Sequence, residues 1–206
     1  MMRTRFTRDL STIKTMSEEI SQLIIISYDR IDLYLENNNE DNLDHVIELN
    51  DDVRSGASGI ERLCFELLAL QQPVATDLRL IQMVIKLASS QKRIASHLAS
   101  VAEILKNYNL SDKEKRFLKE FVDNQRNMTK DGMEAFVTND KDLALLTIDK
   151  DEINNKVFVE AITYAADENK TDKIGAVELA NKILLFKYFE RLGDRLARVA
   201  DLATRL

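Results

Sequence analysis

The two residues best placed to do chemistry are a pair of carboxylates one helical turn apart. Glu190 and Asp194 lie in the segment ERLGDRLARVADL, residues 190–202. On a helix, positions i and i+4 share a face, where like charges repel at a cost of roughly 0.2–0.5 kcal/mol. A bound divalent metal ion would offset this repulsion, because hard cations prefer oxygen ligands. Neighbouring arginines would offset it equally well, and the spacing leaves both interpretations open.

The chain contains a second version of this helix. The segment KRIASHLASVAEI, residues 92–104, keeps the apolar positions, with Leu98 matching Leu196. Both carboxylates are replaced, however, by Lys92 and Ser96. The sequence therefore predicts that any metal site of this kind is single and belongs to the later helix.

Other catalytic and metal-binding patterns are absent from the sequence. His45 and His97 are its two histidines, and neither stands in an HExxH pattern. A ferritin-like di-iron site needs Glu-x-x-His on two helices, whereas HVIE at His45 has the reverse order. No glycine-rich phosphate loop and no GxSxG nucleophile pattern occurs. We therefore predict that the protein is not an enzyme.

Composition excludes two further classes. The chain has 206 residues, with 35 acidic and 29 basic side chains and a net charge of −6. Since its basic residues are scattered, nucleic acid is not expected as a partner. No apolar run approaches the length of about 18 residues that a membrane helix needs. The N-terminal stretch lacks the apolar segment of a signal peptide, so none is expected. The single Cys64 fits a reducing compartment, so we expect a cytoplasmic protein.

The pattern of apolar residues predicts an all-α protein. Five glycines, one proline and no tryptophan accompany apolar positions spaced by three and four residues. The expected helices span about 8–36, 42–70, 73–107, 112–137, 141–166 and 174–206. Pro73 is expected to begin the third helix, because a missing N–H costs nothing in a first turn. Ser111 and Glu114 have the spacing of a capping box that begins the fourth.

The six helices form two copies of one unit. The segment NNEDNLDHVIELNDDV at 38–53 parallels TNDKDLALLTIDKDEI at 138–153, an offset of 100 residues. Short loops make successive helices antiparallel. The sequence therefore predicts two tandem three-helix antiparallel bundles, residues 1–108 and 109–206, related by an internal pseudo-twofold duplication.

Two motifs resemble the PhoU family of phosphate-uptake regulators. They are QPVATDLR at 72–79 and ERLGD at 190–194, and the resemblance spans essentially the whole chain. It implies a non-enzymatic, cytoplasmic adaptor that forms a homodimer. Such an adaptor links the ATPase subunit of the phosphate ABC transporter to a phosphate-sensing histidine kinase, and represses the phosphate-starvation response. It reaches the membrane only through those partners.

The resemblance also implies site residues. Gln72, Pro73, Asp77 and Arg79 form the candidate partner-binding corner. From the residues alone, this string reads as a helix start with Asp77 near the positive end of the helix dipole.

Some members of the family bind iron, zinc or other divalent metals through acidic motifs. Glu190 and Asp194 carry that motif here, and Asp149 and Glu152 are acidic companions by position. No cofactor is required, and one metal site in the second repeat is expected at most. A metal-binding carboxylate bundle and a structural dimerisation module remain the alternative functions.

The first repeat departs from the family pattern. Besides Lys92 and Ser96, it has Asn50 and Arg54 where the family usually has Asp and Asn. We expect the Lys92 ammonium group to supply the positive charge that a metal would otherwise bring.

Overall fold

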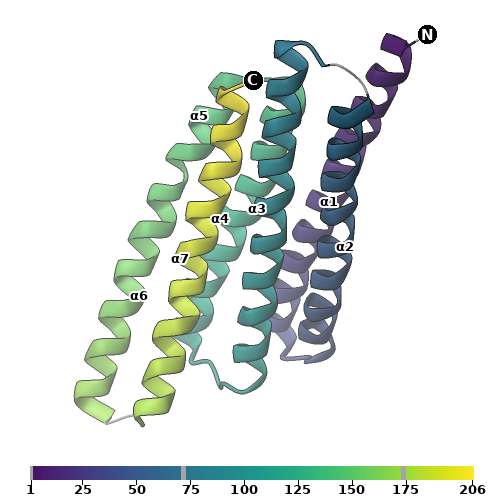
Figure 1. Ribbon diagram of the computed structural model, residues 1–206. Coiled ribbons are helices and arrows are strands. Elements are labelled where there is room, and N and C mark those ends of the chain that lie inside the picture. Colours follow the sequence, from purple (N-terminus) through teal and green to yellow (C-terminus); the bar gives the residue numbers. More distant parts are fainter. Residues whose placement is uncertain (1, 71–72, 173–174) are drawn as a thin grey trace.

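A computed structural model shows a bundle of long helices (Figure 1). It describes residues 2–70, 73–172 and 175–206, and all regular structure in these ranges is helical, which confirms the all-α prediction. The helices are α1 (Met2–Asn37), α2 (Asp41–Leu70), α3 (Ala75–Lys106), α4 (Asp112–Thr138), α5 (Lys141–Asp149), α6 (Asp151–Asp172) and α7 (Ala176–Thr204).

Two predicted boundaries were wrong. The third helix begins at Ala75 rather than Pro73, because Val74 is extended (φ −77°, ψ 168°) and serves as the N-cap. The predicted helix 141–166 is divided at Lys150 into α5 and α6, and α6 continues to Asp172. The division has a physical cause, since the Lys150 carbonyl accepts a hydrogen bond from a side chain of α4, Asn124, at 3.0 Å.

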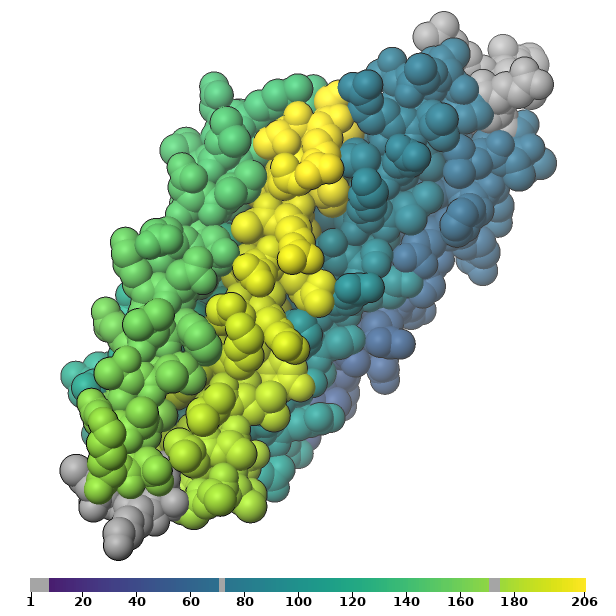
Figure 2. Space-filling view, turned by 60° about the vertical axis from the view of Figure 1, so that its left-hand side comes forward, coloured from purple at the N-terminus to yellow at the C-terminus, as the bar shows by residue number. Residues whose placement is uncertain are grey.

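The two units lie side by side along their length. Helices α1–α3 form the first and α4–α7 the second, and the predicted boundary at 108/109 falls in the loop between α3 and α4. The units meet where α3 packs on α7 and α1 packs on α4. Helices α3 and α7 run antiparallel (Figure 1), and α7 occupies the middle of one broad face, between α6 and α3 (Figure 2).

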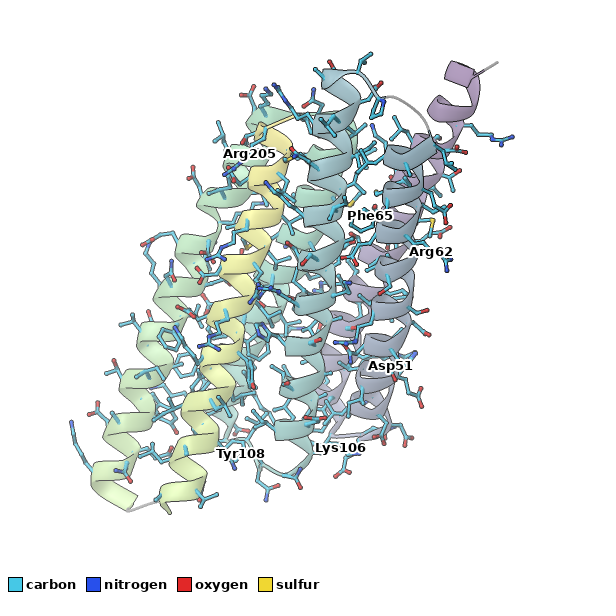
Figure 3. All side chains as sticks on the ribbon, viewed as in Figure 1. Asp51, Arg62, Phe65, Lys106, Tyr108 and Arg205 are labelled. Carbon is cyan, nitrogen blue, oxygen red and sulfur yellow. The ribbon has the colours of Figure 1, made fainter. Side chains whose placement is uncertain are left out.

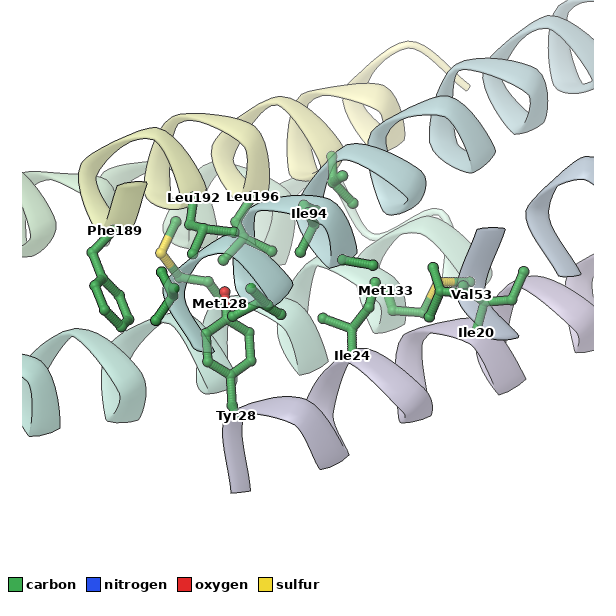
Figure 4. Packing of buried hydrophobic residues seen from close by; sticks show 14 of the residues in the cluster. Ile20, Ile24, Tyr28, Val53, Ile94, Met128, Met133, Phe189, Leu192 and Leu196 are labelled. Atoms are coloured by element: carbon green, nitrogen blue, oxygen red, sulfur yellow. The ribbon is translucent and has the colours of Figure 1, made fainter. Parts of the chain in front are cut away.

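One continuous hydrophobic core joins the units. Its buried members come from both repeats, including Ile24 of α1, Ile94 of α3 and Leu196 of α7 (Figure 4). Phe121 of α4 and Phe189 of α7 are fully buried and stack with their ring centroids 5.2 Å apart. Because apolar burial is the dominant favourable term in folding, neither repeat retains its full core without the other.

A buried ionic network connects the α3–α4 loop to the second unit. The Lys182 ammonium lies 3.2 Å from Glu114 Oε1 and also pairs with Glu168. Burial lowers the pKa of Lys182, but hydrogen bonds to Glu168 and Tyr108 and the charge of Glu114 outweigh it and raise the pKa overall. Tyr108, at the lower end of α3 in Figure 3, donates to Glu114 at 2.7 Å. Glu114 also completes the capping box with Ser111, as the sequence predicted.

The stacked aromatic pair provides a test of the core packing within the second unit. Replacing Phe121 with Ala removes a fully buried ring, and should lower the free energy of unfolding by about 3–5 kcal/mol. The matched control is Phe65→Ala, because 61% of Phe65 is exposed, and its effect should stay within about 0.5 kcal/mol. Urea unfolding followed by circular dichroism measures both. Equal losses in the two variants would contradict the packing described here.

Candidate functional site

The carboxylate pair of α7 faces the junction of α5 and α6. Glu190 is half-buried, and its Oε2 lies 2.7 Å from Lys187 Nζ one turn earlier, whereas Asp194 is exposed. A third carboxylate, Asp151 at the start of α6, completes the group. Burial, and then the charges of Asp194 and Glu190, raise the pKa of Asp151 above its ordinary value. The structure therefore brings together Glu190, Asp194 and an aspartate that the sequence analysis did not select.

The close approach of α6 to α7 depends on a glycine. A Cβ atom built on Gly193 would lie 2.3 Å from Asp151 Oδ1 and 2.5 Å from Asn154 Nδ2, too close for any side chain. Asn154 in turn donates to Asp151 Oδ1 at 3.0 Å. The carboxylates of α6 and α7 thus approach each other only because Gly193 has no side chain.

Buried amides hold the junction in place. Gln125 of α4 is fully buried, and its Nε2 donates to the Phe189 carbonyl at 2.7 Å and lies 3.3 Å from Asn154 Oδ1. Asn124 donates to Asn154 Oδ1 at 3.0 Å as well as to the Lys150 carbonyl. These contacts satisfy the polar groups at the helix break, which would otherwise be costly to bury.

One signal in the sequence could have identified this junction. The offset of 100 residues between the repeats aligns Arg54 with Asn154. The family's Asn at this position therefore pointed to Asn154. The family's Asp position, occupied by Asn50 in the first repeat, aligns with Lys150, so the pattern did not point to Asp151. Gln125 gave no such signal, because its burial follows from the packing of distant segments.

The predicted companions lie elsewhere. Asp149 and Glu152 are both exposed, and they line a shallow hollow together with Ile148, Asp151 and Asn155. Within the described residues, no group of three or more His, Cys, Asp or Glu side chains could hold a metal ion. Glu190 already has a cationic partner in Lys187. As arranged, the donor set does not fit a metal, and the single metal site stays a prediction for elemental analysis of the purified protein.

The equivalent place in the first repeat has different chemistry. Lys92 Nζ lies 2.7 Å from Glu61 Oε2 of α2, so a direct ion pair joins the two helices there. Ser96 Oγ lies 3.3 Å from Asn50 Oδ1 and accepts a hydrogen bond from Arg54 at 3.4 Å. The positive charge of Lys92 is thus paired with the carboxylate of Glu61, which belongs to the same repeat.

The predicted partner corner lies where α2 passes into α3. Pro73 and Asp77 are half-buried and Arg79 is exposed, whereas Gln72 lies outside the described residues. The corner also exposes large apolar side chains that the sequence analysis did not select: Leu70 (69%), Val74 (59%) and Leu78 (42%). We call these six described residues, Leu70, Pro73, Val74, Asp77, Leu78 and Arg79, the α2–α3 corner.

Two ranges of the chain, 13–105 and 118–203, match the family model of the PhoU domain. This chain belongs to the PhoU family. The two matched ranges correspond closely to α1–α3 and to α4–α7. The PhoU resemblance of the two sequence motifs is thereby confirmed.

Several curated PhoU proteins align over nearly the whole chain. A protein of Methanothermobacter thermautotrophicus, named phosphate-specific transport system accessory protein PhoU homolog 1, is 29% identical over 201 residues. The alignment covers 95% of this chain and 91% of that protein. The PhoU homolog of Borreliella burgdorferi is 26% identical over 210 residues, with coverage of 98% and 94%.

Solved PhoU structures share the fold. PhoU from Pseudomonas aeruginosa superposes with a TM-score of 0.86 at 22% identity and covers 96% of each chain. The phosphate transport system regulatory protein PhoU from Streptococcus pneumoniae also gives 0.86, at 20% identity, with coverage of 96% and 94%. Among the helices described here, none is long and apolar enough to cross a membrane.

The glycine at the α6–α7 approach can be tested by substitution. Gly193→Ala should lower the free energy of unfolding by about 1–3 kcal/mol, because the new methyl group displaces Asp151 and the buried Asn154. Gly59→Ala is the control. Its Cβ would meet only Met16 Cε at an ordinary 3.6 Å, so it should stabilise the helix by about 0.5–1 kcal/mol. Urea denaturation compares them, and a neutral Gly193→Ala would rule out the close approach.

The raised pKa of Asp151 predicts a pH dependence. A carboxyl group whose pKa is higher in the folded state binds more protons when folded, so its contribution to stability falls as pH rises through that pKa. Asp151→Asn keeps the acceptor for Asn154 and removes the charge. The stability that the variant gains over the parent should therefore be larger at pH 7 than at pH 4, because an unfolded aspartate begins to lose its proton at about pH 4.

Thermal unfolding at both pH values measures the gain, and Asp149→Asn, at an exposed position, is the control. If the two variants respond identically to pH, the carboxylates of α6 and α7 do not interact as described.

Proposed function

We propose that this chain is a non-enzymatic accessory protein of a phosphate-specific transport system. In this role it links the ATPase subunit of the phosphate ABC transporter to a phosphate-sensing histidine kinase, and represses the phosphate-starvation response when phosphate is plentiful. The observation that carries the proposal is the match of both halves of the chain to the PhoU domain. Relatives that align over 95% and 98% of the chain are named accessory proteins of that transport system.

The distribution of side chains supports an adaptor. The polar groups buried at the α5–α6 junction are amides whose hydrogen bonds connect helices, and they stabilise the bundle. At the α2–α3 corner, by contrast, exposed Val74 and Leu78 lie beside Asp77 and Arg79. An apolar centre with charged residues around it is the composition that protein-binding surfaces favour.

The proposal includes a homodimer that works in the cytoplasm. Large apolar side chains are exposed on α6 and on the first half of α7, among them Val159 (62%), Val177 (77%) and Leu184 (44%). A second copy of the chain would cover such side chains, since an exposed apolar surface of this kind favours association. Sedimentation of the purified protein tests this part independently of its partners.

Gene deletion tests the regulatory function. We expect a strain that lacks the protein to express phosphate-starvation genes in high phosphate, as read by a reporter, and the intact gene to restore repression. If repression persists in the deletion strain, the protein does not regulate this response, and a purely structural dimerisation role takes precedence.

The α2–α3 corner is tested by complementation. The double variant Val74→Asp/Leu78→Asp introduces charge on an exposed surface, so it should fold normally and yet fail to restore repression. Leu145→Asp/Leu146→Asp is the matched control, because these two α5 side chains are 54% and 62% exposed and lie outside both proposed surfaces, and it should restore repression fully. Circular dichroism of each protein verifies the fold. A corner variant that represses normally would remove this surface from the proposal.

A further inference from the structure

Four arginines and a histidine gather where α3 packs on α7. Arg93 and His97 lie one turn apart on α3, and Arg191, Arg195 and Arg198 follow on α7 at spacings of four and three residues. The contact is direct, since the His97 and Tyr188 ring centroids are 5.4 Å apart. These helices run antiparallel, and α7 lies beside α3 on the broad face seen in Figure 2. We call the five residues the arginine patch.

The patch brings together equivalent positions of the two repeats. The alignment of residues 92–104 with 190–202 matches Arg93 with Arg191, and His97 with Arg195. Because α3 and α7 are antiparallel neighbours, these residues come close together, and the charges of Arg93, Arg191 and Arg195 all act on His97. Positive charge is therefore concentrated where α3 packs on α7, although the chain as a whole has a net charge of −6.

The arginines of the patch have no carboxylate partner in the part of the chain that the structure describes. Neighbouring acids on α7 are otherwise engaged, because Glu190 pairs with Lys187 and Asp201 pairs with Arg205. Asp194 is the carboxylate whose charge acts on Arg195, at a distance longer than an ion pair. Three guanidinium groups on one helix face repel one another, so the patch is electrostatically incomplete.

Two buried nitrogen atoms in the patch also lack a partner in the described part of the chain. His97 Nδ1 and Arg195 Nε are buried and have no hydrogen-bond partner among the described residues. Buried polar nitrogens are almost always paired, and an ordered water or a bound ion is one of the ways in which such exceptions are completed. Burial, followed by the charges of Arg195, Arg191 and Arg93, lowers the pKa of His97 from 6.5 to about 4. The imidazole is therefore neutral at pH 7, and the four arginines supply the positive charge.

We propose that the arginine patch is a binding site for a phosphate group, presented either by free orthophosphate or by a polyphosphate chain. The planar guanidinium group has donors spaced to contact two phosphate oxygens at once, and it stays charged at all physiological pH values. A compact anion with two or more charges can contact arginines of both helices together. The carboxylates of an acidic protein surface each carry a single charge and lie apart from one another, so they would contact fewer of these arginines at the same time than a phosphate group does.

This inference is independent of the proposed function, because it concerns binding to the isolated protein. Bound phosphate would join α3 of the first repeat to α7 of the second through a shared ligand. The site would then respond to the anion itself, whether or not a transporter subunit or a kinase is present.

Isothermal titration calorimetry of the purified full chain tests the proposal. Orthophosphate and tripolyphosphate are titrated separately at constant ionic strength set with potassium chloride, and polyglutamate is titrated in parallel. We expect at least one phosphate compound to bind. The affinity should fall at least about tenfold in Arg191→Gln/Arg195→Gln, because each charge-assisted hydrogen bond contributes enough for about a tenfold change. The tighter phosphate ligand identifies the source of the group.

A control variant removes two positive charges at positions outside the arginine patch. Arg62→Gln/Arg116→Gln removes two exposed arginines of α2 and α4, and should leave the affinity unchanged. Arg191→Lys/Arg195→Lys retains the charge but not the planar fork, so its affinity should lie between that of the parent and that of the Gln variant. The proposal is overturned if neither phosphate compound binds, if polyglutamate alone binds, or if the patch and control variants weaken binding equally.

Discussion

The arrangement of four helices depends on one buried amide. Gln125 of α4 is fully buried, and every polar atom of its side chain has a partner. Its Nε2 donates to the Phe189 carbonyl of α7 and approaches Asn154 of α6, while Tyr28 of α1 lies 3.3 Å from its Oε1. An unpaired amide group at this depth would cost roughly 1–3 kcal/mol, about twice what a formed hydrogen bond contributes. Helices α1, α4, α6 and α7 therefore pack in a register that satisfies this side chain.

That constraint explains why the two repeats have the same architecture and different chemistry. The register leaves the face between α6 and α7 close enough that Gly193 is required, and it brings three carboxylates together there. In the first repeat, the corresponding contact between α2 and α3 is closed by the Lys92–Glu61 ion pair. Duplication preserved the core positions, because each copy must pack against the other. The charged positions at the two helix contacts differ between the repeats. An ion pair holds α2 against α3, whereas hydrogen bonds from buried amides hold the start of α6 near α7.

The sequence predicted the features that depend on local spacing, namely the helices and a helix cap. It did not predict the features that depend on contacts between residues far apart in the chain. Apolar spacing predicted the helices, and the Ser111–Glu114 spacing predicted a cap that the structure has. The break at Lys150 was missed, since Lys150 itself keeps helical dihedral angles and its carbonyl partner, Asn124, lies 26 residues away. The same limitation applied to the site. Asp149 and Glu152 were selected by sequence position, whereas the aspartate facing α7 is Asp151, whose place depends on that break.

The position of α3 connects the two surfaces proposed for binding. Its first turn contributes Val74 and Leu78 to the α2–α3 corner, and its middle contributes Arg93 and His97 to the arginine patch. A ligand shifts a conformational equilibrium only by the difference between its affinities for the two states. Gln125 forms hydrogen bonds with residues of α1, α6 and α7, whereas the arginine patch lies where α3 packs on α7, which is the contact at which a bound anion would act. An anion that contacts arginines of both helices would bind best where α3 and α7 hold those arginines close together, so its affinity depends on how the two repeats pack.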